Sequence, residues 1–310
     1  MGAVEWVLLL CLATVWGGSF FFGKLALAEL PPLSLAATRV GLAAAALAML
    51  LRSRGESLPA NPRAWLPYLG MAVLNNAIPF TLIFWGQTQI TAGLASILNA
   101  TTPIFTVLVA HALTVDERLT PTRVAGAVLG LAGVAGMVGP DALAGLGGQV
   151  LAQAAVLAAA LSYAFAGVFG RRFRGQSPYR TATGQLAASS AMMVPIALLV
   201  DAPWQRSLPG VTTVGAVLGL ALISTALAYV LYFRILAAAG ATNLLLVTLL
   251  IPVSAILLSV AFLGEGVTPA QLAGMGTIGL SLLVIDGRIP SAATTIAARI
   301  DRSRRDLWGS

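Results

Sequence analysis

Long apolar runs alternate with short polar loops along the whole chain. The runs begin near residues 6, 33, 65, 92, 123, 150, 181, 211, 241 and 270, and each is long enough, or nearly so, to cross about 30 Å of hydrocarbon as an α-helix. The connecting loops hold turn-forming sequences such as Pro31-Pro32 and Pro140-Asp141, and they are too short for a soluble domain. The pattern predicts an all-α polytopic membrane protein with ten transmembrane helices.

The same succession of residues occurs once in each half of the chain. Pro103 and Pro252 lie inside matching apolar runs, 149 residues apart (252 − 103). Glu117 and Glu265 close those runs, 148 residues apart (265 − 117). A period of half the chain predicts two structural repeats. The predicted repeats are residues 4–140 and 148–286, with five helices each, followed by a basic tail at 287–310.

The distribution of basic residues indicates how the helices are oriented. If the N-terminus is cytoplasmic, most arginines fall in cytoplasmic loops and in the tail, while the opposite side holds little more than Lys24 and Arg206. Acidic residues, among them Glu29 and Asp201, gather on that opposite side. The positive-inside rule then predicts that both termini are cytoplasmic. Because five spans is an odd number, the second repeat enters the membrane from the other side, so the repeats are inverted.

Composition supports a membrane protein and excludes other classes. Hydrophobic residues make up 58% of the chain and charged residues 9%, and the mean hydropathy is +0.90. The net charge of +7 lies in short loops and the tail, where topology explains it, so we expect no nucleic acid. The single Cys11 and the single His111 exclude an internal disulfide and a histidine-rich metal site. We expect neither a metal nor a cofactor.

Glycines are frequent in the fifth run of each half. Residues 274–279 spell the dinucleotide-binding sequence G-x-G-x-x-G, but no strand precedes them and they lie inside a predicted span. Together with Gly126, Gly130 and Gly133 they are typical of small residues that allow helices to approach closely. The pattern predicts that the fifth helix of each repeat is a packing surface.

Polar and aromatic residues recur at one depth in both halves. Pro103 and Pro252 each remove a helical hydrogen bond and free the carbonyl four residues back, at Asn99 and Thr248. In lipid such a carbonyl must face protein or a water-filled cavity, so we expect a central cavity, although prolines that only bend their helices remain an alternative. The predicted binding residues are Trp16, Asn75, Asn76, Asn99, Tyr163, Ser224, Thr225, Tyr229, Tyr232 and Thr248, and the predicted hinges are Gly17, Gly18, Pro103 and Pro252.

Few charged residues lie inside the predicted spans. Arg39 is about two turns into the second span from the outside, and Lys24 is near the outer end of the first. We expect both side chains to extend to the outer surface, or else to take part in an outer vestibule beside Glu29. The centre is therefore expected to be polar and aromatic without a fixed charge. Since no carboxylate lies near the centre of a span, tight coupling to protons is not indicated.

The ten spans, the inverted repeats and the ending of each fourth helix carry a family resemblance. That helix runs from Pro103 to Asp116-Glu117 and from Pro252 to Gly264-Glu265, and this organisation resembles the EamA family of the drug/metabolite transporter superfamily. The chain looks most like the YddG-type exporters of aromatic amino acids. The resemblance implies a bacterial inner-membrane protein, not an enzyme, that exports aromatic and other neutral amino acids by alternating access through a central cavity.

Other functions remain open at this stage. Exporters of other small metabolites or drugs belong to the same superfamily, whereas a sugar-phosphate carrier needs fixed cations at the cavity centre. A membrane-embedded lipid-modifying enzyme needs an acid–base pair or an activated nucleophile, which one histidine, one cysteine and acids in loops do not supply. The expected partners are a small-molecule substrate and the lipid bilayer, and we expect a monomer.

Overall fold

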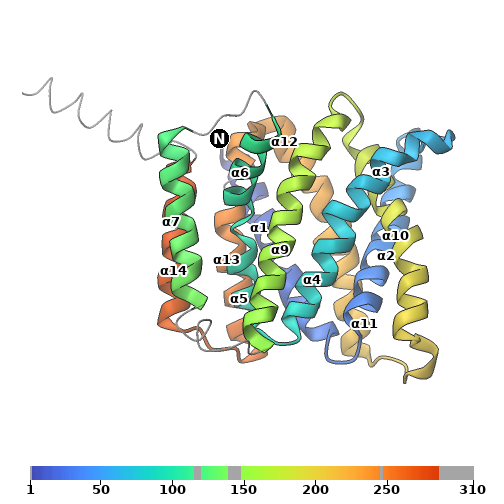
Figure 1. The fold of residues 1–310 in the computed structure, drawn as a ribbon. Coiled ribbons are helices and arrows are strands. Elements are labelled where there is room, and N and C mark those ends of the chain that lie inside the picture. The colour runs from blue at the N-terminus through green and yellow to red at the C-terminus, as the bar shows by residue number, and fades with distance from the viewer. Residues whose placement is uncertain (1, 115–119, 139–147, 245–246, 286–310) are drawn as a thin grey trace, which may run out of the picture.

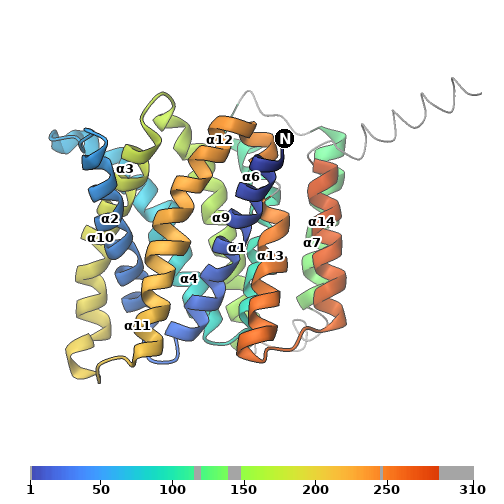
Figure 2. The ribbon, with the colours of Figure 1, turned by 180° about the vertical axis from the view of Figure 1, so that it is seen from behind.

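The computed structural model describes residues 2–114, 120–138, 148–244 and 247–285, and in these ranges the secondary structure is helical with no strand (Figure 1). Glu117, Pro140-Asp141 and the basic tail lie outside the described residues. The helices stand side by side in a bundle, and the N-terminus lies at one end of it (Figures 1 and 2).

Each predicted apolar run within the described ranges forms helix. The first half consists of α1 (Ala3–Ala26), α2 (Pro32–Ser53), η1 (Pro62–Trp65), α3 (Leu66–Met71), η2 (Ala72–Ala77), α4 (Ile78–Gln87), α5 (Ala92–Asn99), α6 (Thr102–Leu113) and α7 (Pro121–Val138). The second half consists of α9 (Gly148–Phe169), η3 (Gly170–Phe173), α10 (Pro178–Asp201), η4 (Pro203–Gln205), α11 (Val211–Leu218), η5 (Gly219–Leu227), α12 (Ala228–Leu244), α13 (Val247–Leu258), η6 (Ser259–Leu263) and α14 (Pro269–Ile285).

Seven helical segments of the described chain are long and apolar enough to cross a membrane. They are Ala3–Ala26, Pro32–Ser53, Pro62–Gln87, Ala92–Leu113, Gln149–Phe173, Pro178–Gln205 and Val211–Ile235, and shorter apolar helices follow at Leu250–Leu263 and Pro269–Ile285. Large apolar side chains on the outer surface, such as Leu199 and Phe262, are 80% and 71% exposed, which suits lipid and not water. The helical membrane fold is confirmed, and the number of ten crossings stays a prediction.

The two halves pack through matching pairs of helices. The second helices, α2 and α10, lie side by side, and so do the fifth helices, α7 and α14. The first helix of each half packs on the fourth helix of the other, α1 on α13 and α9 on α5 and α6. In Figure 1, α1 begins at the end where the N-terminus lies and α9 begins at the opposite end. Each contact is thus reproduced when the halves are exchanged, as a pseudo-two-fold axis in the membrane plane requires.

A π-helical segment interrupts the third helix in both halves. It is η2 in the first half and η5 in the second, and these carry the matched pairs Asn75-Asn76 and Ser224-Thr225. The Thr225 hydroxyl donates to the Leu220 carbonyl five residues back, at 2.8 Å, within the wide turn. Segments of this kind occur frequently at functional sites, because the wider turn redirects the side chains that follow it.

The fifth helices pack through glycine, as the sequence predicted. A Cβ atom at Gly126 would lie 2.6 Å from Ile285 Cγ1, and one at Gly130 would lie 2.6 Å from Ser281 Oγ. The Ser281 hydroxyl donates to the Gly126 carbonyl at 2.7 Å, which joins α14 to α7. Only hydrogen at these positions lets the two backbones approach to this distance.

The predicted hinge residues lie in different helical settings. The helix α1 is continuous through Gly17 and Gly18. Pro103 lies in the first turn of α6, after α5 has ended at Asn99, so it interrupts no helical hydrogen bond. The Asn99 carbonyl accepts a hydrogen bond from Thr102 Oγ1 at 2.7 Å, so the prediction of a freed carbonyl there is wrong. Pro252 lies inside α13, as expected.

Candidate functional site

A cavity of about 530 Å³ lies between the two halves of the bundle, a size within the range of roughly 300–1,000 Å³ that small-molecule sites occupy. Residues of α1, α2, η2, α4 and α5 line it from the first half, and residues of α9, α10, η5, α12 and α13 from the second. The lining combines aromatic side chains with a few polar groups, which is the usual composition of a site that binds a small organic molecule.

Nine of the ten predicted binding residues line this cavity. They are Trp16, Asn75, Asn99, Tyr163, Ser224, Thr225, Tyr229, Tyr232 and Thr248. Asn76 does not, because consecutive residues of a helix point in different directions. Its side chain is fully buried, and Nδ2 donates to Ser189 Oγ of α10 at 2.8 Å. The placement of Asn76 in the site was therefore wrong, whereas the binding roles of the other nine stay predictions.

A hydrogen-bonded group of three side chains forms one wall. Gln185 Nε2 donates to the Tyr229 hydroxyl at 2.8 Å, and Asn75 Nδ2 lies 3.3 Å from both the Tyr229 hydroxyl and Gln185 Oε1. Gln185 is 3% exposed and lines the cavity, but it was not among the predicted binding residues. At the repeat offset of 148 its counterpart is Ala37, so a comparison of the halves gives no signal for it.

Aromatic rings form a second wall. The Trp16 and Tyr232 rings are 5.8 Å apart between centroids, and Phe233 contacts Tyr232 edge-on at 5.1 Å and Tyr229 in a stacked arrangement at 6.1 Å. Phe233 also lines the cavity and was not predicted. These rings offer flat apolar faces together with hydroxyl and indole N–H groups, so they can contact an aromatic or aliphatic part of a ligand.

Arg39 lies in the cavity, contrary to the expectation that it extends to the outer surface. The residue is only 8% exposed, and its guanidinium carbon is 3.8 Å from the centroid of the Phe80 ring. Its Nε donates to Thr225 Oγ1 at 2.9 Å. No aspartate or glutamate is among the described residues that line the cavity. The centre therefore contains one fixed positive charge, and the predicted uncharged centre was wrong.

Three buried polar atoms of cavity-lining residues have no hydrogen-bond partner within the described part of the chain. They are Asn99 Oδ1, Gln87 Oε1 and Ser224 Oγ. A buried polar atom without a partner costs about 1–3 kcal/mol. These atoms belong to residues of the cavity wall, so a small rearrangement of a side chain that turns one of them towards a ligand would supply the missing hydrogen bond.

Carboxylates close the end of the bundle opposite the N-terminus. Asp201 accepts hydrogen bonds from the Ser34 backbone N–H and hydroxyl, both at 2.7 Å. Glu265 accepts from the Ala92 N–H at 2.9 Å, and Glu29 from the Gly210 N–H at 2.6 Å. In each case the acid belongs to one half and the N–H to the other. Glu29 is thus bonded to a loop of the second half.

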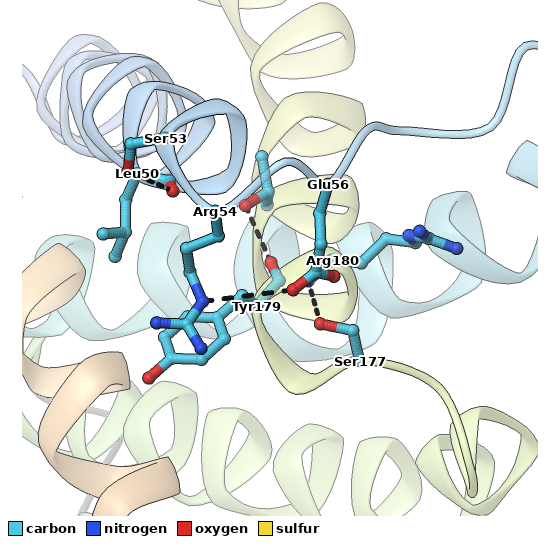
Figure 3. A network of polar contacts seen from close by, with 8 residues as sticks. Leu50, Ser53, Arg54, Glu56, Ser177, Tyr179 and Arg180 are labelled. Atoms are coloured by element: carbon cyan, nitrogen blue, oxygen red, sulfur yellow. Dashed lines mark hydrogen bonds and ion pairs between the residues drawn. The ribbon is translucent and has the colours of Figure 1, made fainter.

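At the arginine-rich end, Arg54 at the end of α2 lies beside Tyr179 of α10 (Figure 3). There Arg54 Nε lies 4.0 Å from Glu56 Oε1, and the Arg54 guanidinium carbon lies 4.4 Å from the centroid of the Tyr179 ring. The ion pair lies within the segment that follows α2 and contributes roughly 0–1 kcal/mol, whereas the contact with Tyr179 joins the end of α2 to α10. Lining residues are buried near both ends, such as Ser96 and Gln87 near the acidic end and Ala166 and Phe173 towards the arginine-rich end.

A polytopic helical bundle with two matching halves and a polar cavity between them has the architecture of a membrane carrier. The EamA-like transporter family model matches residues 4–139 and 150–286, and the chain belongs to this family. It is 30% identical to a probable amino-acid metabolite efflux pump of Escherichia coli (strain K12), over 92% of this chain and 95% of that protein. It is 25% identical to YedA, an uncharacterized inner membrane transporter of the same strain, over 89% of each chain. A crystal structure with 20% sequence identity aligns with a TM-score of 0.65 over 92% of this chain and 98% of the other, which supports the fold.

Proposed function

We propose that this transporter exports amino acids, aromatic and other neutral ones, from the bacterial cytoplasm by alternating access of the central cavity. The observation that carries the proposal is the composition of the cavity, in which aromatic faces stand beside hydrogen-bonding groups and a guanidinium. The name of the Escherichia coli efflux pump, which is 30% identical, supports the same substrate class. A site of this kind holds the groups common to all amino acids and selects side chains loosely.

The asymmetry between the two ends supports the direction of transport. Links between the halves close the acidic end, and the positive-inside rule assigns the opposite, arginine-rich end to the cytoplasm. In this conformation the cavity would receive substrate from the cytoplasm, as an exporter requires. Because no carboxylate lines the described cavity, flux is expected to follow the substrate gradient without proton coupling, in a monomer with both termini in the cytoplasm.

Export from intact cells tests the proposal. Bacteria that express the protein and are fed phenylalanine-containing dipeptides should release phenylalanine faster than cells that carry an empty vector, and should tolerate more dipeptide. The matched control expresses a variant with two cavity substitutions, Trp16→Ala and Asn99→Leu, at the same level in the membrane. Equal release from all three strains, for every amino acid supplied, would contradict the proposal.

A further inference from the structure

The Arg39 guanidinium is held by two contacts in the wall of the cavity. One face of the guanidinium covers the Phe80 ring at 3.8 Å, the Phe84 centroid is 5.8 Å away, and Nε is engaged by Thr225 Oγ1. Nη1 and Nη2 have no acceptor among the described residues, and Arg39 lines the cavity. These two nitrogens form the planar pair that binds the two oxygens of a carboxylate side by side.

The charge of Arg39 has no acidic partner in the described chain. The ion pair found there joins Arg54 to Glu56, at the arginine-rich end of the bundle and away from Arg39. A positive charge buried within a membrane span is unfavourable unless it is paired, and stacking on an aromatic ring offsets only part of this cost. An ionisable residue at such a place is expected to serve function. A negatively charged group of a ligand would supply the missing partner.

We propose that Arg39 binds the carboxylate of the transported solute, so that a carboxylate is required for binding while an amino group is not. This inference rests on the proposed function in that the solute is the substrate of the central cavity. With one arginine and no acid among its described lining residues, the cavity is matched to a monoanionic group. Decarboxylated amines and neutral amides lack the group that Arg39 binds.

The ammonium of an amino acid meets only neutral acceptors. Among the amides that line the cavity, Asn99 Oδ1 has no partner in the described residues, whereas Gln87 Oε1 lies against α1 beside Gly23. Hydrogen bonds from an ammonium to neutral oxygens compensate less than an ion pair does. Loss of the ammonium should therefore weaken binding less than loss of the carboxylate, and simple carboxylic acids become ligands of the same site.

A ligand series on the purified wild-type protein tests this order. Binding of phenylalanine, 3-phenylpropanoate, phenylalaninamide and phenethylamine is measured by isothermal titration in detergent. We expect phenylalanine and 3-phenylpropanoate to bind within about tenfold of each other, and the two ligands without a carboxylate to bind roughly 10- to 100-fold more weakly. The series requires no mutation, so its result does not depend on whether a variant folds.

Two substitutions then assign the effect to Arg39. Arg39→Gln should weaken phenylalanine and 3-phenylpropanoate by roughly 10- to 100-fold and leave phenethylamine unchanged, whereas Arg39→Lys, which keeps the charge, should retain part of the affinity. Arg206→Gln removes the same charge from an exposed residue of the acidic-end loop and should bind all four ligands as the wild type does. A purely structural arginine would lower the melting temperature without changing the order of the ligands.

The outcomes separate this inference from the proposed function. Equal binding of phenylalanine and phenethylamine, or wild-type affinity of Arg39→Gln for phenylalanine, overturns the role of Arg39 and leaves amino-acid transport standing. Arg39-dependent binding of 3-phenylpropanoate without binding of phenylalanine supports the role of Arg39 and contradicts amino-acid transport. If none of the four ligands binds the wild type, both are overturned.

Discussion

Asn99 is the residue whose side chain is most clearly prepared for a ligand. It is the last residue of α5, it lines the cavity, and Oδ1 is buried without a partner in the described chain. Its backbone carbonyl is occupied by Thr102, so the side chain alone is available to a substrate. The helix break at Ala100-Thr101 thus leaves the Asn99 side chain at the cavity wall, where the sequence had predicted both this side chain and its backbone carbonyl as binding groups.

Substitution of Asn99 by leucine tests this role. A neutral hydrogen bond contributes about 0.5–1.5 kcal/mol, so Asn99→Leu should reduce the transport of every amino acid by roughly 2- to 10-fold. The loss should be similar for large and small substrates, because the amide contacts a group that all of them share. Initial rates for phenylalanine and threonine at equal membrane expression are the measurement, and wild-type rates for both would remove Asn99 from the site.

Trp16 is expected to act on the side chain of the substrate instead. Its ring lies against Tyr232 at 5.8 Å and forms part of the cavity wall. An aromatic pair contributes about 0.5–1.5 kcal/mol beyond the burial of area, so Trp16→Ala should reduce phenylalanine transport several-fold more than threonine transport. Trp85→Ala is the matched control, since Trp85 is 37% exposed and does not line the cavity. An equal loss for both substrates would contradict this assignment.

Comparison of the two halves of the sequence finds only residues that are polar or aromatic in both. It located Asn75 and Ser224, which lie in equivalent π-helical segments and both line the cavity. It could not find Arg39, whose counterpart at the offset of 148 is Ala187. Residues without a matching polar or aromatic partner in the other half therefore cannot be found by this comparison. Their position in the cavity depends on packing between helices far apart in sequence.

At the scale of helices, Gly17 holds α1 against α13. A Cβ at Gly17 would collide with Ser254 Oγ and lie 2.8 Å from the Ala255 backbone nitrogen. The Ser254 hydroxyl donates to the Ala13 carbonyl at 2.8 Å, so the same contact also joins the two helices by a hydrogen bond. A Cβ at Gly18 would have its nearest neighbour at 3.7 Å, in ordinary van der Waals contact.

Two alanine substitutions distinguish these neighbouring glycines. Gly17→Ala should separate α1 from α13 and destabilise the protein by about 1–3 kcal/mol, as overpacking does. Gly18→Ala meets no obstacle and should be neutral or stabilising by up to about 1 kcal/mol, because alanine favours helix. The melting temperatures of the two variants in detergent provide the measurement. Equal melting temperatures would show that the close approach at Gly17 is not needed.

The proline positions show how far helix boundaries follow from sequence. Pro103 and Pro252 occupy equivalent positions in the repeat, but Pro252 lies inside α13 and Pro103 begins α6. The difference arises in part because Thr102, beside Pro103, has a hydroxyl that bonds the Asn99 carbonyl and closes the turn. Near Pro252 the Ser254 hydroxyl also bonds local carbonyls, those of Leu250 and Ile251, yet α13 continues. The sequence around a proline therefore does not by itself decide whether the proline bends a helix or starts one.

For the whole molecule, the sequence predicted the helical membrane fold and its division into similar halves. Both predictions were possible because the length of the apolar runs and the period of the repeat can be measured in a single sequence. The cavity volume and the closed acidic end could not be predicted, since they depend on how helices of different halves meet. The acids Glu29, Asp201 and Glu265 were expected at one end, and the structure adds that each bonds to a backbone N–H of the other half.

The orientation in the membrane is tested by single cysteines in a Cys11→Ser background, since Cys11 is the one cysteine of the chain and is exposed. Arg206→Cys, at the acidic end, should react with an impermeant thiol reagent added to intact cells. Arg174→Cys, in the loop after η3, should react only after the cells are opened. Labelling of Arg174→Cys from outside would reverse the assignment of the cytoplasmic side.

The central claim is that a cavity between two inverted halves carries amino acids across the membrane without proton coupling. Counterflow into proteoliposomes tests it most directly, with the purified protein, an internal pool of unlabelled amino acid, and labelled phenylalanine, leucine and threonine outside. We expect all three to accumulate transiently, at rates that a proton gradient changes by less than about twofold and that Asn99→Leu lowers by roughly 2- to 10-fold. Absence of counterflow for every amino acid, or uptake that occurs only with a proton gradient, would contradict the account.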